Sequence, residues 1–381
     1  MVANDILNSG RFHRVKPESQ LLVMKKATSS DDLTLCRDSD AVIYLSPFRH
    51  QVGGHAVMLC PDQFHICKPY IEREANFYRK MPKSIAEYTP AFCGEMQVKV
   101  GEKCGRILTK ASTSSVDGRK SCTLCSDGDS FVCKIKSYAH QMSMEHKFRD
   151  IESGLLNEAN PWSVECQMRT QKANKHHNID AENRYIILEN IAHQFRYPCV
   201  LDLKMGTRQY GDGVSEKKRL NFLRKCERST SKKYGVRVGG MQYFDISTSI
   251  YQCVNKYYGE SLNFYEMRNL LIRFLHCASD SDRCRILRNS VHKKLVQLHK
   301  ALSGSDGCRL FSASLLIVYD GDPELVSANS DNKGRVEVRL VDFAHSTCEN
   351  MNDEVRYAGP DSGILLGIHT LISVFASPFN C

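Results

Sequence analysis

The first ordered pattern in the chain is a series of short apolar runs that alternate with polar positions, as is typical of β-strands. These runs cover residues 42–45, 56–59 and 64–68. Strand-breaking residues, such as Pro47 and the Gly53–Gly54 pair, separate them. Pro69 then suits the first turn of a helix that extends over 68–81. The pattern predicts a compact, strand-rich N-terminal lobe.

The second half of the chain alternates between apolar strand-like runs and helical periodicity. Predicted strands lie at 184–190, 198–205, 235–245 and 249–258, and paired strands lie at 312–321 and 335–346. Predicted helices begin near Ser215, with Leu220, Leu223 and Cys226 on one face, and cover 262–277, 284–302 and 362–375. Strands therefore lie in both halves while helices gather in the second, which predicts an α+β protein with two lobes.

Two stretches lack a periodic pattern. Residues 1–40 are polar, and we expect them to be flexible. Residues 101–178 are rich in Ser, Thr, Gly and Asp, which predicts a low-complexity insertion that is at least partly disordered. Cys122 and Cys125 resemble half of a zinc site, but no second pair follows at the proper spacing, so a reduced, flexible loop is the preferred interpretation. The predicted N-terminal lobe is 41–190, including this insertion, and the C-terminal lobe is 191–381.

Composition narrows the class of protein only a little. The 381 residues are 42% hydrophobic and 25% charged, as in ordinary globular proteins, and no apolar run is long enough to span a membrane. The net charge of +9 favours anionic partners, but no nucleic-acid-binding motif accompanies it. Seventeen irregularly spaced cysteines and the absence of an apolar leader indicate reduced thiols in the cytoplasm or nucleus.

Polar residues at the ends of, or inside, the predicted strands are the candidates for chemistry. Lys68 ends a strand, and Glu74 follows it in a helix. Asp202 and Lys204 are two apart in a strand and so share one face. Asp342 ends another apolar strand. Nucleotide-dependent phosphoryl transfer needs this set: a lysine on the phosphates, an acid to hold it, and a carboxylate for magnesium.

Each feature taken alone has an ordinary structural explanation. A strand-end lysine is usually solvated, the Asp202–Lys204 pair resembles a surface salt bridge, and Asp342 resembles a turn residue. The run of cations in the helix after Ser215 resembles a solvated helix face, and it consists of Lys217, Lys218, Arg219, Arg224 and Lys225. The occurrence of all these features in one order favours an enzyme.

The segment PCVLDLKMG (198–206) fits the P-x-x-x-D-x-K-x-G signature, and the sequence here resembles the inositol polyphosphate kinase family. SASLLIVYDG (312–321) is similar to the Ser-Leu-Leu strand of that family, and LVDFAHS (340–346) to its metal-binding strand. Further segments resemble the hexakisphosphate kinase branch, namely 47–55, 67–78, 160–163, 205–213 and 357–363. The resemblance implies a two-lobed inositol polyphosphate kinase fold, related to protein kinases and ATP-grasp enzymes, with antiparallel sheets in both lobes.

The resemblance also implies roles for individual residues. For ATP these are Lys68 on the phosphates, Glu74 as its partner, Glu189 and Ile191 at the adenine, Asp202 at the ribose and Asp342 on magnesium. For the inositol phosphate they are Lys204, which also meets the transferred phosphoryl group, and Lys217, Lys218 and Arg224. Lys204, Asp342 and Lys68 would be catalytic. Ser314 and His345 lie in matching segments without an assigned role.

The activity implied is ATP- and magnesium-dependent phosphorylation of inositol hexakisphosphate, and of the pentakisphosphate as a second substrate, to diphosphoinositol polyphosphates. One alternative is a multikinase or trisphosphate 3-kinase that phosphorylates inositol hydroxyls. Another is a catalytically silent scaffold that binds inositol phosphates and recruits protein partners through 101–178. The intact set Lys68, Asp202, Lys204 and Asp342 argues against the scaffold.

Overall fold

The computed structural model describes most of the chain outside its N-terminal segment and the 111–182 region. The described residues are 46–54, 56–100, 107–110, 183–275, 281–322, 324–327 and 331–376. All of them belong to one compact unit, Asp40–Cys381. The predictions for residues 1–40, and for Cys122 and Cys125, lie outside this part of the chain, and of the predicted insertion only Ile107–Lys110 is described.

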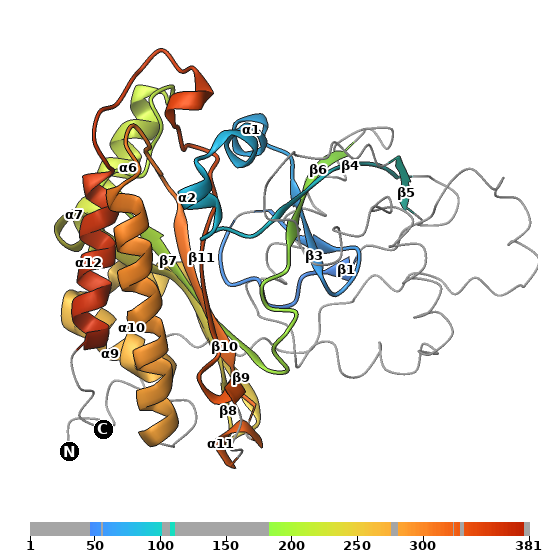
Figure 1. Cartoon of the computed structure of the whole chain (residues 1–381), viewed down its shortest axis with the longest axis vertical. Coiled ribbons are helices and arrows are strands. Elements are labelled where there is room, and N and C mark those ends of the chain that lie inside the picture. Colours follow the sequence, from blue (N-terminus) through green and yellow to red (C-terminus); the bar gives the residue numbers. More distant parts are fainter. Residues whose placement is uncertain are drawn as a thin grey trace, which may run out of the picture. The chain divides into compact units, whose positions relative to one another are not determined.

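The first sheet is antiparallel and has the strand order β1-β2-β3-β6-β4-β5 (Figure 1). Its strands are β1 Ser46–Pro47, β2 Leu59–Cys60, β3 His65–Pro69, β4 Phe92–Val100, β5 Ile107–Lys110 and β6 Asn183–Glu189. Two helices follow β3, α1 Glu72–Lys80 and α2 Lys83–Ala86. The strand that follows the long insertion, β6, thus lies between two strands that precede it in the chain, β3 and β4.

The second sheet is also antiparallel, with the order β11-β10-β7-β8-β9. Its strands are β7 Pro198–Met205, β8 Val236–Asp245, β9 Ile250–Val254, β10 Ser314–Asp320 and β11 Val336–Val341. The helices are α6 Glu216–Arg228, α7 Ser231–Tyr234, α8 Lys256–Ser261, α9 Phe264–Leu275, α10 Ser281–Ser303, α11 Glu324–Ser327 and α12 Ser362–Ala376, with short 3₁₀ turns η3 Asp331–Gly334 and η4 Glu349–Met351. The predicted α+β class with an antiparallel sheet in each half is confirmed.

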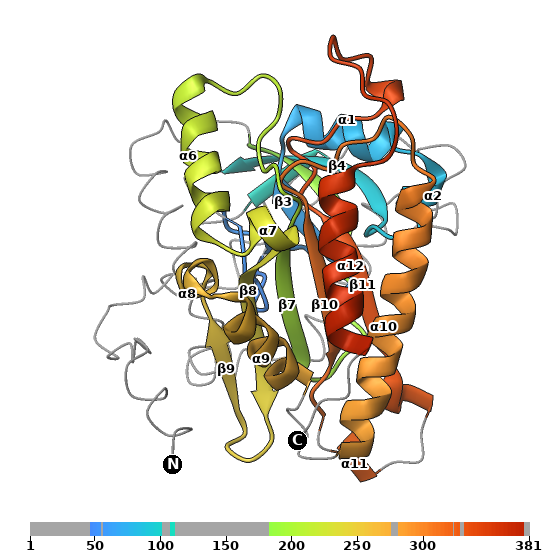
Figure 2. The ribbon, with the colours of Figure 1, turned by 90° about the vertical axis from the view of Figure 1, so that its left-hand side faces the viewer.

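Helices α9, α10 and α12 cover one face of this second sheet (Figure 2). The apolar stripe predicted for 284–302 is the buried face of α10, and its residues are Leu287, Val291, Leu295, Leu298 and Leu302. Alternate residues of β7 point into this core, including Leu201 and Leu203. Because neighbouring side chains in a strand point to opposite faces, Asp202 and Lys204 lie on the face that the helices do not cover.

Several local predictions were wrong. Pro69 does not start a helix, because it pairs with Tyr185 as the last residue of β3, and α1 begins at Glu72. The predicted strand 249–258 ends at Val254, because Asn255 accepts hydrogen bonds from the next backbone N–H groups and starts α8. Leu220 does not pack on one face with Cys226, since it is 41% exposed.

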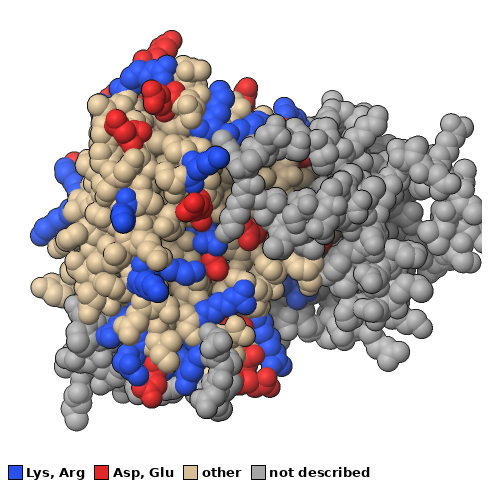
Figure 3. Space-filling model, viewed as in Figure 1, with Lys and Arg blue, Asp and Glu red and all other residues tan. Residues whose placement is uncertain are grey.

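Charges of both signs are interspersed on the face of the molecule drawn in Figure 3. The positive net charge is therefore not gathered into one basic surface on that face. No helix among the described residues is both long and apolar enough to cross a membrane.

Candidate active site

Two lysines from distant parts of the sequence bond to one carboxylate, that of Asp342. Lys68 Nζ lies 2.6 Å from Asp342 Oδ1, and Lys204 Nζ lies 2.8 Å from Asp342 Oδ2. Lys68 also donates to Glu74 Oε1 at 2.7 Å. The four residues that the sequence indicated for phosphate and metal chemistry are therefore brought together, in a line Glu74–Lys68–Asp342–Lys204.

The two sheets and α1 fix this line in place. Lys68 is held in β3 by pairing with Ile186 in β6, and Lys204 is held in β7 opposite Ser314 in β10. Asp342 follows β11 directly and has a left-handed backbone with φ of 67°. Glu74 is fully buried, and the carboxylate oxygen that holds Lys68 also accepts from the backbone N–H of Phe343 at 3.1 Å. Helix α1 is thereby bonded to the turn that carries Asp342.

The proximity of the three groups changes their ionisation. Burial alone would raise the pKa of Asp342, but Lys204 and Lys68 outweigh it and hold that pKa well below its ordinary value. Burial likewise opposes the charge on the two lysines, and Asp342, with Glu74 beside Lys68, raises their pKa values instead. Asp342 is therefore ionised at neutral pH, and both of the lysines that bond to it are charged.

Asp202 is enclosed rather than exposed. Its side chain is buried at 4% exposure, and burial raises its pKa. A Cβ atom built on Gly53 would lie 2.1 Å from Asp202 Oδ2, and one built on Gly239 would lie 2.8 Å from Oδ1. Glycine at both positions lets the backbone of the 46–54 loop and of β8 close around the carboxylate. The Lys204 ammonium offsets the effect of burial on the pKa of Asp202 only in part, and Ser314 beside them is also fully buried.

Glu189 and Ile191 lie where the chain leaves the first sheet. The Glu189 carboxylate accepts from the backbone N–H of Ala91 at 3.0 Å, and its own backbone N–H donates to the carbonyl of Ala91. Ile191 is buried in an apolar cluster with Val52 of the 46–54 loop and Val200 of β7. This connection between the sheets is therefore packed against the strand that carries Lys204.

Most of the basic residues of α6 are exposed, and one face of the helix approaches the rest of the site. Burial, followed by Arg73 and Lys218, lowers the pKa of His345, which lies three residues after Asp342. The ring of Phe222, one turn along from Lys218, lies 6.5 Å from that of His345. Lys217 and Arg224 share a different face of α6. The structure thus brings Lys218 near His345.

Arg237 is a basic residue that the sequence did not single out. It lies in β8 directly opposite Lys204, donates to Gln209 at 2.8 Å, and has its pKa lowered by burial. Its Nε has no hydrogen-bond partner among the described residues. The signal that identifies it is the alternation in β8, where buried Val236 and Val238 place Arg237 on the face that carries Lys204.

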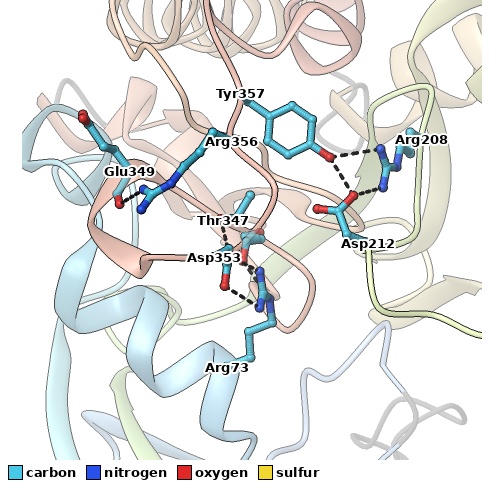
Figure 4. Close-up of polar contacts among 9 residues, drawn as sticks. Arg73, Arg208, Asp212, Thr347, Glu349, Asp353, Arg356 and Tyr357 are labelled. Atoms are coloured by element: carbon cyan, nitrogen blue, oxygen red, sulfur yellow. Dashed lines mark hydrogen bonds and ion pairs between the residues drawn. The ribbon is translucent and has the colours of Figure 1, made fainter.

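The two segments 205–213 and 357–363 contact each other (Figure 4). Tyr357 donates to Asp212 at 2.6 Å, and Arg208 binds both of them. On the other side of the same connection, Arg73 from α1 pairs with Asp353 (Figure 4). The chain between β11 and α12 is therefore bonded both to α1 and to the loop that precedes α6.

The side chains around Asp342 determine which metal ion this site suits. Among the described residues, no group of three or more His, Cys, Asp or Glu side chains could hold a metal ion. Asp342 is a single ionised carboxylate beside two lysines. This set suits Mg²⁺, which is held by one or two carboxylates while substrate phosphates and water fill the other positions.

Comparison with known proteins agrees with this geometry. Residues 185–376 match the family model described as inositol polyphosphate kinase. The chain is 32% identical to inositol hexakisphosphate kinase 1 of Rattus norvegicus and of Homo sapiens, over 89% of this chain and 94% of each relative. It is 31% identical to inositol hexakisphosphate kinase 3 of Mus musculus, over 87% and 94%.

A solved structure has the same fold. The inositol phosphate multikinase Ipk2 of S. cerevisiae, in complex with ADP and Mn²⁺, superposes with a TM-score of 0.52 at 20% identity, over 82% of this chain and 98% of that one. Its low identity limits the likeness to the fold, while the family match runs from β6 through the second sheet and the relatives cover 87% to 89% of this chain. The chain belongs to the inositol polyphosphate kinase family, whose members are ATP-dependent kinases.

Proposed function

We propose that this protein is an inositol hexakisphosphate kinase, which transfers the γ-phosphoryl group of ATP to a phosphate of inositol hexakisphosphate. The observation that carries the proposal is the line Glu74–Lys68–Asp342–Lys204, with Lys218 of α6 near His345. The hexakisphosphate kinases among its relatives support this choice of substrate, and inositol pentakisphosphate is the second substrate that we propose.

Lys68 and Asp342 are proposed to bind the nucleotide phosphates and their metal. Glu74 holds the Lys68 ammonium from behind, so the lysine keeps its position when Asp342 exchanges it for another cation. Asp342 is the residue that would hold Mg²⁺, and the bound ion would neutralise charge on the phosphates. The backbone near Glu189 and Ile191 is proposed to bind adenine.

Asp202 is proposed to bind the ribose hydroxyls, and this role requires a movement. The carboxylate lies against Gly53 at 4% exposure, so the 46–54 loop must shift before a hydroxyl can reach it. Gln51 braces this loop by bonding the carbonyls of Gly53 and Ala56. Opening of the loop would therefore accompany nucleotide binding.

Lys204 is proposed to contact both the moving phosphoryl group and the acceptor. Arg237 lies opposite Lys204 in β8 and is proposed to add a second cation at this point. Inositol hexakisphosphate carries about ten negative charges, at ~1.5 to 2 per phosphate. Lys218 and His345, with Lys217 and Arg224 further out, are proposed to bind its remaining phosphates. These cations offset the repulsion between two phosphates that must approach each other.

The transfer needs no general base, because the attacking oxygen of the acceptor phosphate is already deprotonated. A multikinase or trisphosphate 3-kinase must instead remove a proton from an inositol hydroxyl. The contact between segments 205–213 and 357–363, which resemble the hexakisphosphate branch, favours the first activity. A silent scaffold would not need the complete line Glu74–Lys68–Asp342–Lys204.

Product analysis tests the proposal. The full chain is incubated with labelled ATP, Mg²⁺ and, separately, inositol hexakisphosphate, pentakisphosphate and trisphosphate. We expect a diphosphate product from the first two substrates. Phosphorylation of the trisphosphate without any diphosphate product would establish the multikinase alternative. Binding of hexakisphosphate without turnover of any substrate would establish the scaffold.

The compartment that we propose is the cytosol or the nucleus. No disulfide joins any two of the nine cysteines in the described ranges, which suits a reducing compartment. Fractionation of cells that express a tagged full-length chain tests this assignment.

A further inference from the structure

Two thiols face each other beside the active site, in a short antiparallel contact outside both sheets. Arg309 and Thr347 exchange two backbone hydrogen bonds, each with an N–O distance of 2.8 Å. In an antiparallel pairing, the residues next to such a hydrogen-bonded pair face each other without backbone bonds, with Cα atoms about 4.5 Å apart. Cys308 precedes Arg309, and Cys348 follows Thr347. The register therefore sets the two cysteines directly opposite one another.

This position suits a cross-strand disulfide. Disulfides join residues whose Cα atoms are about 4.4 to 6.8 Å apart, a range that includes the spacing of such a pair. Cys348 has extended backbone angles, with φ of −148° and ψ of 168°. Both side chains are buried at 3% exposure, so they are held in place, and Cys348 lies one residue from the exposed Glu349. A bond between them needs little movement of the backbone.

Cys348 also differs in acidity from Cys60 and Cys67. Contact with the Cys308 thiol, aided by the backbone N–H groups after Cys348, lowers the pKa of Cys348 to about 7, and the same contact raises the pKa of Cys308. By contrast, burial raises the pKa of Cys60 to about 12 and that of Cys67 well above its ordinary value. Because the thiolate is the reactive form, Cys348 should react before Cys60 and Cys67.

We propose that Cys308 and Cys348 form a redox-sensitive dithiol, which hydrogen peroxide converts into an intramolecular disulfide. The Cys348 thiolate attacks one peroxide oxygen, which gives a sulfenic acid and releases hydroxide. The Cys308 sulfur then attacks the sulfenic sulfur, and the displaced hydroxide takes up the Cys308 proton as water. In sum, two thiols and one peroxide give one disulfide and two water molecules.

The bond would close a loop that contains β10, β11 and Asp342. It would also take the Cys348 Sγ away from the carbonyl of Lys80 at the end of α1, to which it now donates at 3.6 Å. Asp342 has to leave at least one of its two lysines when nucleotide phosphates bind. A disulfide at Cys348, six residues after Asp342, would hinder this movement. The disulfide is therefore expected to slow turnover, a consequence that rests on the proposed kinase function.

Peptide mapping tests the disulfide itself. The full chain is treated with hydrogen peroxide, alkylated, digested and analysed by mass spectrometry with and without reductant. We expect a linked peptide pair that contains Cys308 and Cys348 and that dithiothreitol separates. In a Cys308→Ser variant, Cys348 should instead accumulate as a sulfenic acid trapped by dimedone, while Cys67→Ser should leave the linkage intact. A wild-type chain in which Cys348 stays reduced, or pairs with another cysteine, overturns the proposal.

Stability and rate test the consequence. The oxidised wild-type chain should melt several degrees higher, because the cross-link restricts the unfolded chain. It should also turn over at least two-fold more slowly, and dithiothreitol should restore both values. Cys308→Ser should show neither change after peroxide. A mapped disulfide without a change in rate would overturn the proposed effect on catalysis only. Absence of kinase activity in the reduced chain would refute the proposed function and leave the mapping result standing.

Discussion

The line Glu74–Lys68–Asp342–Lys204, which is our proposed transfer centre, and the basic helix α6 use lysine in opposite ways. At the centre, Lys68 and Lys204 come from different sheets, are largely buried, and both pair with Asp342. On α6, Lys217 and Lys218 are neighbours in sequence and exposed, and neither forms an ion pair within the described part of the chain. At the centre the protein balances the charge of both lysines with Asp342, whereas Lys217 and Lys218 on α6 are exposed to solvent.

This difference indicates a division of work. Buried groups that are already oriented stabilise a transition state well, since they need no reorganisation during the reaction. Exposed, flexible cations attract and hold a polyanion, but their contribution falls with salt. We therefore expect the centre to control the rate of transfer, and α6 to control the affinity for inositol hexakisphosphate.

The largest effect that would sharpen this contrast is expected at Asp342. Asp342→Asn, and equally Lys204→Ala, should lower kcat by two to three orders of magnitude, a loss seen when one stabilising group is removed from other active sites. Circular dichroism and thermal melting should show that each variant remains folded. Lys300→Ala, an exposed lysine on α10, serves as the control and should keep full activity. Wild-type turnover in Asp342→Asn would refute the assigned centre.

A smaller effect is expected on α6. The double substitution Lys217→Ala with Lys218→Ala should raise KM for inositol hexakisphosphate about tenfold, or ~1.4 kcal/mol, and leave kcat within two-fold. KM should also depend less on salt than in the wild-type enzyme. Lys232→Ala with Lys233→Ala on α7 is the matched control of equal charge change. A loss of kcat without a change in KM would contradict the expectation that α6 controls affinity while the centre controls the rate.

The smallest effect concerns the loop over Asp202. Gly53→Ala would place Cβ 2.1 Å from Asp202 Oδ2, so unfolding should become easier by ~1 to 3 kcal/mol, the usual cost of overpacking. Gly213→Ala is the matched control, because its Cβ would meet nothing within 4 Å. Denaturant unfolding measures both. Equal stability of the two variants would show that the loop is not closed around Asp202 in solution.

The sequence predicted which segments form strands of the second sheet better than it predicted which strands lie next to each other. Strands β7, β10 and β11 were evident from their apolar runs, and the pairing of β10 with β11 was expected. The position of β7 between β10 and β8 was not, because an apolar run does not say which strands flank it. The enclosure of Asp202 depends on that placement, and on Gly53 approaching from the first sheet.

Among the candidate site residues, the resemblance identified those in motifs and missed one that lies outside them. Lys68, Lys204 and Asp342 lie together as a shared phosphate site requires. Arg237 was missed, since a lone arginine between valines in a strand has the pattern of a solvent-facing residue. Its role depends on which side of the sheet the helices cover, and periodicity alone does not give that side.

The Asp342 bridge has a consequence for selectivity among small anions. A free phosphate or sulfate ion that enters must compete with a carboxylate already bonded to both ammonium groups, and it offers Asp342 no cation in return. A nucleotide that arrives with a divalent ion provides Asp342 with a new cation in place of the lysine that it leaves. The bridge would thus weaken inhibition of the enzyme by inorganic phosphate and sulfate.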